Sequence, residues 1–490
     1  MTTVDIKDLS SLSSGFKPGD VINLKDGTYS NLKVSIKSNG LNGKIIIIKA
    51  QNPGKVILTG TSTITISGTY TTLANLVLKN GGSTSSAVVL NGSFNRVTGF
   101  DASYSDSITD QMFKIDGKKC RIDHCIFHDW NKSGVWVVVS RPSKQEDFAM
   151  IDHNVFMNRI ATGADNGLEC VRVGTSTDSL TTSKTIVMYN KFVNCNGEIE
   201  VVSNKSCDNI YYRNTFDSSE GTLTLRHGDR CTVYANRFEQ KKKPNSGGVR
   251  VTGESHVIAK NFFRDINGNG TTRAGISINN GVKNTPLNGY YQVKNAQIKS
   301  NVFVNCSNDY AVGVQVKTEC VLTPINSSIT NTISYHSDNN ECFSSDKTCL
   351  GSESMDYKNN IFYAKSLGKA PKDDGIILRN PEDFNFSLNE TTLNSIYGSN
   401  EIVGPVWDQN PEDNQITSDL DQYYISLKNT ISDEIKLLDK GIPTPTPTPT
   451  PTPSPDTVTI NKDLYNRLIK IEQQTKNLVN QFQTLKDLID

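Results

Sequence analysis

An Asn-x-Phe pair recurs along the middle of the chain, and this repeat limits the possible folds more than any other feature. Its copies begin at Asn154, Asn190, Asn214, Asn236, Asn261, Asn301 and Asn360. The central copies follow one another every 22 to 25 residues, a period typical of a solenoid whose repeats stack on one another. We therefore expect the phenylalanines to stack inside the coils and the asparagines to form an amide ladder at a bend.

The segments that precede the repeats are short and rich in β-branched and aromatic residues, as at 185–189 and 210–212. Such segments are typical of strands. No helical apolar period of useful length separates the copies, so the crossover helices of an α/β fold have no place. The sequence predicts an all-β protein, a parallel β-helix. The wider gaps between copies indicate inserted loops, which usually gather on one side and build a binding groove.

The composition changes sharply near residue 440 and divides the chain into three parts. Residues 1–440 form the predicted β-helix domain. Residues 441–457 form a linker, because Pro alternating with Thr or Ser favours a stiff polyproline II spacer. Residues 458–490 form a predicted coiled-coil helix. Its heptad seam consists of Leu464, Leu468, Ile471, Thr475, Leu478, Phe482, Leu485 and Ile489. We expect this helix to assemble a homo-oligomer; the alternative is one amphipathic helix docked on the solenoid.

The composition also excludes several classes of protein. Among 490 residues, 51 Lys and Arg balance 51 Asp and Glu, so the charge indicates neither nucleic acid nor membrane as a partner. No apolar run is long enough for membrane insertion, and the first residues lack a secretory signal pattern, which leaves the compartment open. The ten cysteines are too sparse for a disulfide scaffold, so we expect buried thiols.

The run from Asn196 to Glu200 carries the clearest indication of a site. Side chains two residues apart in a strand point to the same face, so Glu198 and Glu200 would hold their carboxylates side by side. Two close carboxylates repel unless a proton or a cation neutralises them, and hard oxygen ligands suit Ca²⁺. Asn166 lies a coil and a modest insertion earlier, where its amide oxygen could complete a calcium shell.

Basic side chains follow at the spacing of the coils. Lys205 and Arg226 are 21 residues apart, and Arg250 follows after another 24. Successive coils would place them on one side of the solenoid, with His227 and Arg172 nearby. Each charge alone is most simply a solvated turn residue. Their joint spacing beside two carboxylates instead favours a site for a negatively charged sugar.

These motifs together resemble polysaccharide lyase family 6, the family of alginate lyases and chondroitinase B. The similar segments are Asn166-Gly167, Arg172 to Ser176, Asn196 to Glu200, Asn204 to Ser206, Arg226 to Gly228 and Gly247 to Gly253. The resemblance spans roughly residues 5–400. It implies a right-handed, single-stranded parallel β-helix that cleaves uronic-acid polysaccharides by calcium-assisted β-elimination. The Pro/Thr linker, the coiled coil and the missing secretory signal depart from the family pattern.

The resemblance also implies roles for single residues. Lys205 matches the general base and Arg226 the general acid. The calcium ligands match Asn166, Glu198 and Glu200. The positions that contact substrate match Arg250, His227 and Arg172. Alginate is the expected substrate, with chondroitin or dermatan-type polymers as the other possibility, and such a substrate implies extracellular or particle-associated action.

The residues are also consistent with this chemistry on physical grounds. Removal of the C5 proton of a uronate is opposed by the neighbouring carboxylate, whose charge Ca²⁺ would offset. Lys205 must be neutral to accept that proton; Ca²⁺ and Arg226 favour the neutral amine, whereas the glutamates favour the charged form. Arg226 would either protonate the leaving C4 oxygen or only stabilise it while water supplies the proton.

Two other functions remain open from the sequence. A glycoside hydrolase on a similar β-helix needs carboxylates that flank the bond, one of them protonated. Glu198 and Glu200 are too close together for that arrangement, which also leaves the basic pair without a role. The fold alone does not exclude a non-catalytic carbohydrate-binding spike or adhesin assembled through the C-terminal helix. The Lys/Arg pair beside the candidate calcium site favours catalysis, and the coiled coil is compatible with both.

Overall fold

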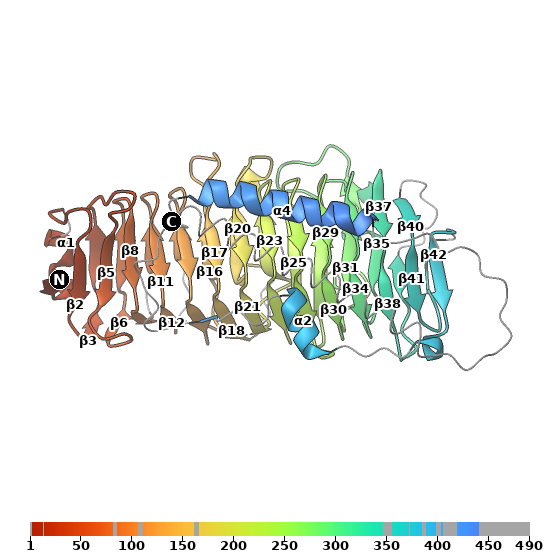
Figure 1. The fold of residues 1–490 in the computed structure, drawn as a ribbon, viewed down its shortest axis with the longest axis horizontal. Helices are drawn as coiled ribbons and strands as arrows, with labels where there is room; N and C mark the ends of the chain where they lie inside the picture. The colour runs from red at the N-terminus through yellow and green to blue at the C-terminus, as the bar shows by residue number, and fades with distance from the viewer. Residues whose placement is uncertain are drawn as a thin grey trace.

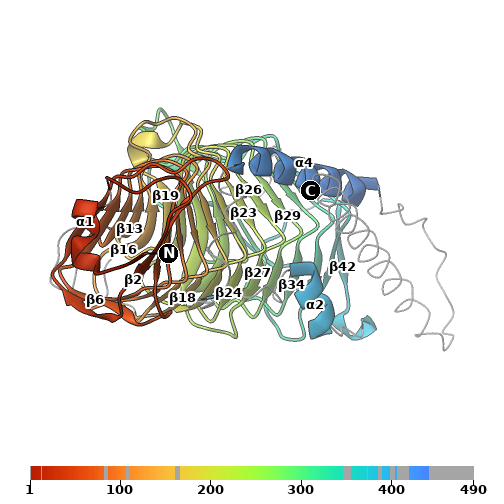
Figure 2. The same ribbon diagram turned by 60° about the vertical axis from the view of Figure 1, so that its left-hand side comes forward.

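The structure is a computed structural model that describes residues 2–12, 14–81, 86–105, 111–160, 166–345, 355–371, 373–384, 389–397, 403–404 and 419–440. Within these residues the chain winds into a long solenoid of parallel strands (Figure 1, Figure 2). This confirms the predicted all-β solenoid. The predicted linker and coiled coil, 441–490, lie outside the described residues.

Three parallel sheets run along the solenoid, and successive coils add strands to each of them. Sheet 1 contains β1 (Thr2–Val4), β2 (Val21–Leu24), β5 (Ile46–Ala50), β8 (Thr71–Ala74), β11 (Arg96–Thr98), β14 (Arg121–Asp123), β17 (Met150–Asp152), β20 (Ile186–Met188), β23 (Ile210–Tyr212), β26 (Thr232–Tyr234), β29 (Val257–Ala259), β33 (Gln297–Lys299), β37 (Ser327–Thr330) and β40 (Met355–Lys358). Sheet 2 contains β4 (Lys33–Ile36), β7 (Thr63–Ile66), β10 (Val88–Leu90), β13 (Gln111–Ile115), β16 (Val135–Val139), β19 (Val171–Gly174), β22 (Glu200–Lys205), β25 (Gly221–His227), β28 (Ser246–Val251), β31 (Ile276–Asn279), β35 (Tyr310–Val314) and β39 (Phe343–Ser345).

Sheet 3 contains β3 (Gly27–Ser30), β6 (Val56–Gly60), β9 (Val77–Asn80), β12 (Asp101–Tyr104), β15 (Ile126–His128), β18 (Val155–Arg159), β21 (Lys191–Cys195), β24 (Thr215–Asp217), β27 (Arg237–Glu239), β30 (Phe262–Arg264), β34 (Val302–Val304), β38 (Ile333–Tyr335), β41 (Asn360–Tyr363) and β42 (Ile376–Arg379). A separate antiparallel pair is formed by β32 (Gly281–Val282) and β36 (Cys320–Leu322). Short 3-10 helices span Ile6–Asp8, Ser176–Asp178 and Pro381–Asp383.

The Asn-x-Phe repeat forms two stacks inside the coils, as the sequence predicts. Neighbouring rings lie 4.6 to 5.0 Å apart, centroid to centroid, in the order Phe127, Phe156, Phe192, Phe216, Phe238, Phe263 and Phe303. At the adjoining bend, the side-chain oxygen of each ladder asparagine after the first accepts from the backbone N–H of the asparagine one coil earlier, and that of the first, Asn154, accepts from the Cys125 N–H. The ladder asparagines are Asn154, Asn190, Asn214, Asn236, Asn261 and Asn301. The rings exclude water, while the amides satisfy buried backbone groups.

Three α-helices of the described part of the chain lie outside the coils. Short α1 (Leu9–Leu12) follows the buried Ile6 near the N-terminal end, and α2 (Glu390–Tyr397) packs beside sheet 3. The longest, α4 (Leu420–Lys440), lies along sheet 1 (Figure 1). No helix in the described part of the chain is long and apolar enough to cross a membrane.

Helix α4 is a feature that the sequence analysis missed inside the predicted β-helix domain. Its packed side chains are Leu420, Tyr424, Leu427, Ile431 and Ile435. They recur every three or four residues, which places them on one helical face. This face packs on sheet 1, where the Tyr424 hydroxyl donates to the Asp208 carbonyl at 2.5 Å. The last solenoid strand among the described residues, β42, ends at Arg379, and α2 and α4 follow it in the chain.

The cysteines lie where the sequence predicts them. Nine of the ten fall on described residues, and all nine are buried free thiols. They act as small apolar side chains within the coils.

Candidate active site

The predicted basic residues lie on four neighbouring strands of sheet 2. Arg172 is on β19, Lys205 on β22, Arg226 and His227 on β25, and Arg250 on β28. The residues that alternate with Arg172, Lys205, Arg226 and Arg250 are buried, so the period of two along each strand turns these four side chains outward. The parallel pairing of these strands therefore brings together residues that lie up to 78 positions apart in sequence.

A β-bulge controls how two of these residues meet Lys205. Asn204 pairs with Leu225, but Lys205 pairs with His227, so Arg226 is one extra residue on β25. Such a bulge re-aims the side chains beside it. On β19, the neighbouring strand on the other side of β22, Gly174 pairs with Lys205. Gly174 has a φ of +85°, and a Cβ there would lie 2.6 Å from the Lys205 carbonyl oxygen. Only glycine permits this close approach.

The two glutamates of the opening run occupy different local structures. Glu200 begins β22, whereas Glu198 lies in the bend before it. The prediction that both belong to one extended strand is therefore wrong, because the chain turns here to enter sheet 2. The carboxylates remain neighbours, since the charge of Glu200 acts on Glu198. Glu198 Oε1 accepts from the Leu168 N–H at 2.9 Å, a contact with the preceding coil.

A third carboxylate, Glu169, was missed from the sequence. It is fully buried, and neither of its side-chain oxygens has a hydrogen-bond partner among the described residues. Its Oε1 lies 3.6 Å from Lys205 Nζ and 3.7 Å from Arg172 Nη1. The available signal was a glutamate between the apolar Leu168 and Cys170, because a charge in a buried run requires a partner.

The electrostatics of the cluster indicate that Glu198 lacks a neutralising positive charge within the described residues. Burial raises the pKa of Glu198 to about 9, and the negative charge of Glu169 adds to this shift. Glu198 is therefore protonated at neutral pH unless a cation binds. Glu200 Oε1 lies 4.0 Å from Arg226 Nε and 3.9 Å from Arg250 Nη1, while its Oε2 accepts from Ser203 at 2.5 Å.

These residues fit a calcium ion by their chemistry. Glu169, Glu198 and Glu200 offer hard carboxylate oxygens, and a bound cation would satisfy the oxygens of Glu169, which accept no hydrogen bond from the described residues. The three carboxylates do not all come within 4.8 Å of one another in the described residues, so side-chain rotation must accompany binding by all three. Asn166 is exposed in the bend before β19, and no hydrogen bond among the described residues joins it to the glutamates.

A loop between β32 and β33 holds Arg226, and sequence reasoning did not foresee this contact. Arg226 Nη1 donates to the Gly289 carbonyl at 2.8 Å and Nη2 to the Asn288 carbonyl at 3.2 Å. The guanidinium carbon lies 4.1 Å from the ring centre of Tyr290, and that of Arg250 lies 5.7 Å away. Carbonyls and an aromatic face thus fix Arg226 without neutralising it.

Burial also changes the proton affinity of Arg226 and His227, the two basic residues of β25. Burial, with the positive charges of Arg226 and Lys205, lowers the pKa of His227 to about 3. His227 is therefore neutral near pH 7, and its Nε2 lies 3.3 Å from Ser176 Oγ. Burial likewise lowers the pKa of Arg226. The site offers a neutral imidazole and buried cationic groups, which suits an anionic ligand that arrives with little water.

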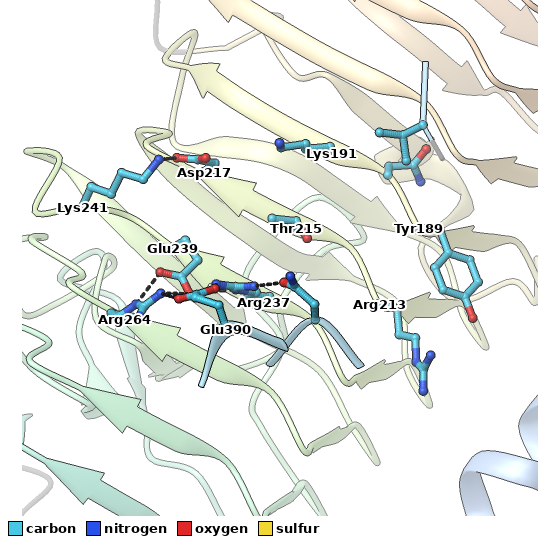
Figure 3. A pocket seen from close by; sticks show the side chains of 13 residues that line it. Tyr189, Lys191, Arg213, Thr215, Asp217, Arg237, Glu239, Lys241, Arg264 and Glu390 are labelled. Carbon is cyan, nitrogen blue, oxygen red and sulfur yellow. Dashed lines mark hydrogen bonds and ion pairs between the residues drawn. The ribbon is translucent and has the colours of Figure 1, made fainter. Parts of the chain in front are cut away.

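A cleft of about 390 Å³ lies elsewhere, on sheet 3, and takes no part in this site (Figure 3). Glu390 of α2 bridges Arg237 and Arg264, with 2.7 Å to each. Glu239 also pairs with both arginines. These arginines are already neutralised, so this cleft makes a poor match for a polyanion.

Comparison with known proteins decides the family. The model of the family described as chondroitinase B matches residues 4–403. The chain belongs to the chondroitinase B family. This confirms the resemblance to family 6 polysaccharide lyases. No protein of curated function matches.

Solved structures of polysaccharide lyase family 6 agree with this membership. The alginate lyase AlyGC is 30% identical over 78% of this chain, with a TM-score of 0.71. This chain covers 53% of AlyGC, about half its length. A mannuronic acid specific lyase from human gut microbiota is 25% identical over 86% of this chain and all of its own length, with a TM-score of 0.73. An alginate lyase in complex with a trisaccharide, 23% identical over 77% of this chain and 87% of its own length, shares the fold with a TM-score of 0.65.

Proposed function

We propose that this protein is a polysaccharide lyase that cleaves alginate by calcium-assisted β-elimination. The observation that carries this proposal is a basic pair beside a cluster of carboxylates, with Lys205 Nζ 3.6 Å from Glu169 and Arg226 Nε 4.0 Å from Glu200. Membership of the chondroitinase B family supports the reaction. Alginate is favoured over dermatan-type polymers because two neighbours at 25% identity or more are described as an alginate lyase, AlyGC, and a mannuronic acid specific lyase.

Calcium is proposed as the cofactor. Glu169, Glu198 and Glu200 would hold it, with Asn166 as the ligand that the family resemblance adds. When bound, it would offset the charge of the uronate carboxylate and so make the C5 proton easier to remove.

Lys205 is proposed as the general base. Its side chain is only 13% exposed, and it shares the outer face of sheet 2 with the other basic residues. Glu169 Oε1 lies 3.6 Å from Nζ and helps to position it. As a neutral amine, Lys205 accepts the C5 proton, and the electron pair left behind forms the C4–C5 double bond as the C4–O bond breaks.

Arg226 is proposed to act on the leaving oxygen at C4. The loop carbonyls of Asn288 and Gly289 and the ring of Tyr290 fix its guanidinium. Its lowered pKa makes proton donation easier than from a solvated arginine, although stabilising the oxygen while water donates also fits. Arg250, Arg172 and neutral His227 would bind the polymer's carboxylates and hydroxyls.

The glycoside hydrolase remains the alternative with one observation in its favour. A retained proton on Glu198 is what a general acid needs, and its pKa is raised to about 9. That reading leaves Lys205 and Arg226 without a task and disagrees with the chemistry of the family, so we propose the lyase.

The direct test is a panel of uronic-acid polymers incubated with the protein, with and without a calcium chelator. We expect a rise in ultraviolet absorbance from unsaturated products with alginate, its loss with chelator and its return with added calcium. New reducing ends without that absorbance would indicate hydrolysis. Binding without any cleavage of the panel would favour the non-catalytic carbohydrate-binding protein.

A further inference from the structure

The phenylalanine stack is interrupted once, near the C-terminal end of the solenoid. The strand register pairs Phe303 with Ser334 and Ser334 with Phe362. A serine therefore occupies the place where the coils before and after it hold a ring. Two fully buried polar residues, Asp309 and His336, lie beside it. The chain has replaced apolar packing with a polar cluster in its interior, which is costly unless the cluster is satisfied.

A cysteine completes this cluster. Asp309 immediately precedes β35, His336 follows β38, and Cys342 immediately precedes β39, and all three are fully buried. One carboxylate oxygen, one ring nitrogen and the Cys342 sulfur lie within 4.8 Å of one another. Both Asp309 oxygens are 3.1 Å from His336 Nε2, and Oδ2 also accepts from Ser334 Oγ at 2.6 Å.

One buried atom in the cluster has no hydrogen-bond partner. Nδ1 of His336 makes no hydrogen bond within the described residues. The nearest acidic group is Asp338, whose Oδ1 is 3.7 Å away. A metal on the other ring nitrogen, with an outer carboxylate facing this one, is the usual surrounding of a metal-bound histidine.

We propose that Asp309, His336 and Cys342 form a buried zinc site that ties two neighbouring coils near the C-terminal end of the solenoid together. A thiolate, an imidazole and a carboxylate together suit Zn²⁺, whereas Ca²⁺ prefers oxygen ligands alone. The site is buried and lies on other coils than Lys205 and Arg226, so its role is structural. It joins a residue before β35 to residues around β38 and β39, in successive coils.

Protons must leave when zinc enters. Zn²⁺ binds cysteine as a thiolate and histidine through a ring nitrogen that carries no proton, so Cys342 loses its thiol proton and Nε2 of His336 is unprotonated in the complex.

The test uses the full chain, reduced and stripped with a chelator, then titrated with zinc against a chromophoric chelator. We expect one high-affinity zinc per chain and a rise in melting temperature upon binding. Cobalt in place of zinc should give thiolate-to-metal absorption. Cys342→Ser should lose at least about tenfold in zinc affinity. Cys125→Ser, which alters an equally buried thiol in an earlier coil, should keep the wild-type affinity.

Three results would overturn the zinc site. They are a wild-type chain that binds no zinc, a Cys342→Ser variant with unchanged affinity, and cobalt bound without thiolate absorption. The cobalt spectrum of the wild-type chain decides the matter even if Cys342→Ser fails to fold. None of these readouts depends on lyase activity, so the zinc site and the proposed function stand or fall separately.

Discussion

At the scale of single residues, Lys205 and Glu169 show what a sequence can and cannot indicate. Lys205 follows an acidic run at coil spacing from Arg226, so the pattern alone selects it. Glu169 belongs to an apolar run, and its spacing to the other charged residues did not single it out. Only the pairing of β19 with β22 places it 3.6 Å from Lys205. The account therefore depends on both residues, one found by pattern and one by packing.

Replacement of Lys205 tests the general base. Lys205→Ala should lower kcat about 10²- to 10⁴-fold, the usual contribution of a positioned acid or base. Steady-state assays on alginate, with circular dichroism as the check on folding, measure this. Lys191→Ala, an exposed lysine on sheet 3, is the matched control and should keep full activity. A Lys205→Ala enzyme with wild-type turnover would remove Lys205 from the mechanism.

The pKa of Glu198 predicts how calcium affinity depends on pH. Calcium binds the carboxylate form, so affinity should increase from pH 7 toward about 9, by up to about tenfold per pH unit, with proton release. Isothermal titration calorimetry in buffers of different ionisation enthalpy measures both the calcium affinity and the number of protons released. Glu169→Gln should weaken binding, while Glu254→Gln, which alters a surface partner of Lys294, should not. Affinity independent of pH would contradict a protonated Glu198.

At the scale of elements, the repeat could be predicted from the sequence because successive central coils place a Phe and an Asn at the same two interior positions. The Phe stack and the Asn ladder both follow from it. Helix α4 was missed because its apolar spacing lies beyond the last repeat, where no neighbouring copy indicated its role. The bulge at Arg226 and the loop at Tyr290 depend on pairing between strands, which one sequence does not reveal.

The phenylalanine stack should dominate the stability of the solenoid. Phe216 is buried between Phe192 and Phe238, with centroids 4.7 and 4.6 Å away. Phe216→Ala should lower the free energy of unfolding by about 3–5 kcal/mol, because it leaves a cavity in a rigid stack. Val321→Ala, at a side chain 61% exposed, should change it by less than about 0.5 kcal/mol. Equal denaturation midpoints for the two variants would show that the stacked rings contribute no more to stability than an exposed side chain does.

At the scale of the whole molecule, the proposed site and the route to the C-terminus lie on different faces. The site occupies the outer face of sheet 2, whereas α4 packs on sheet 1 and ends at Lys440, just before the Pro/Thr run. A homo-oligomer joined through residues 458–490, which the heptad pattern predicts, would therefore leave the site open to a polymer.

Truncation after Lys440 tests this arrangement. We expect the truncated chain to keep its kcat on alginate and to have a smaller mass by light scattering than the full chain. An unchanged oligomer mass would contradict assembly through the predicted coiled coil. A loss of activity at unchanged fold would show that the tail contributes to catalysis.

The central claim is that the bond breaks by elimination at the Lys205–Arg226 site. The most direct measurement is mass spectrometry of alginate oligosaccharides digested in heavy-oxygen water. Elimination consumes no water, so the account predicts unsaturated products that carry no heavy oxygen from the cleavage. Products that gain one heavy oxygen per cleaved bond would show hydrolysis and contradict the account.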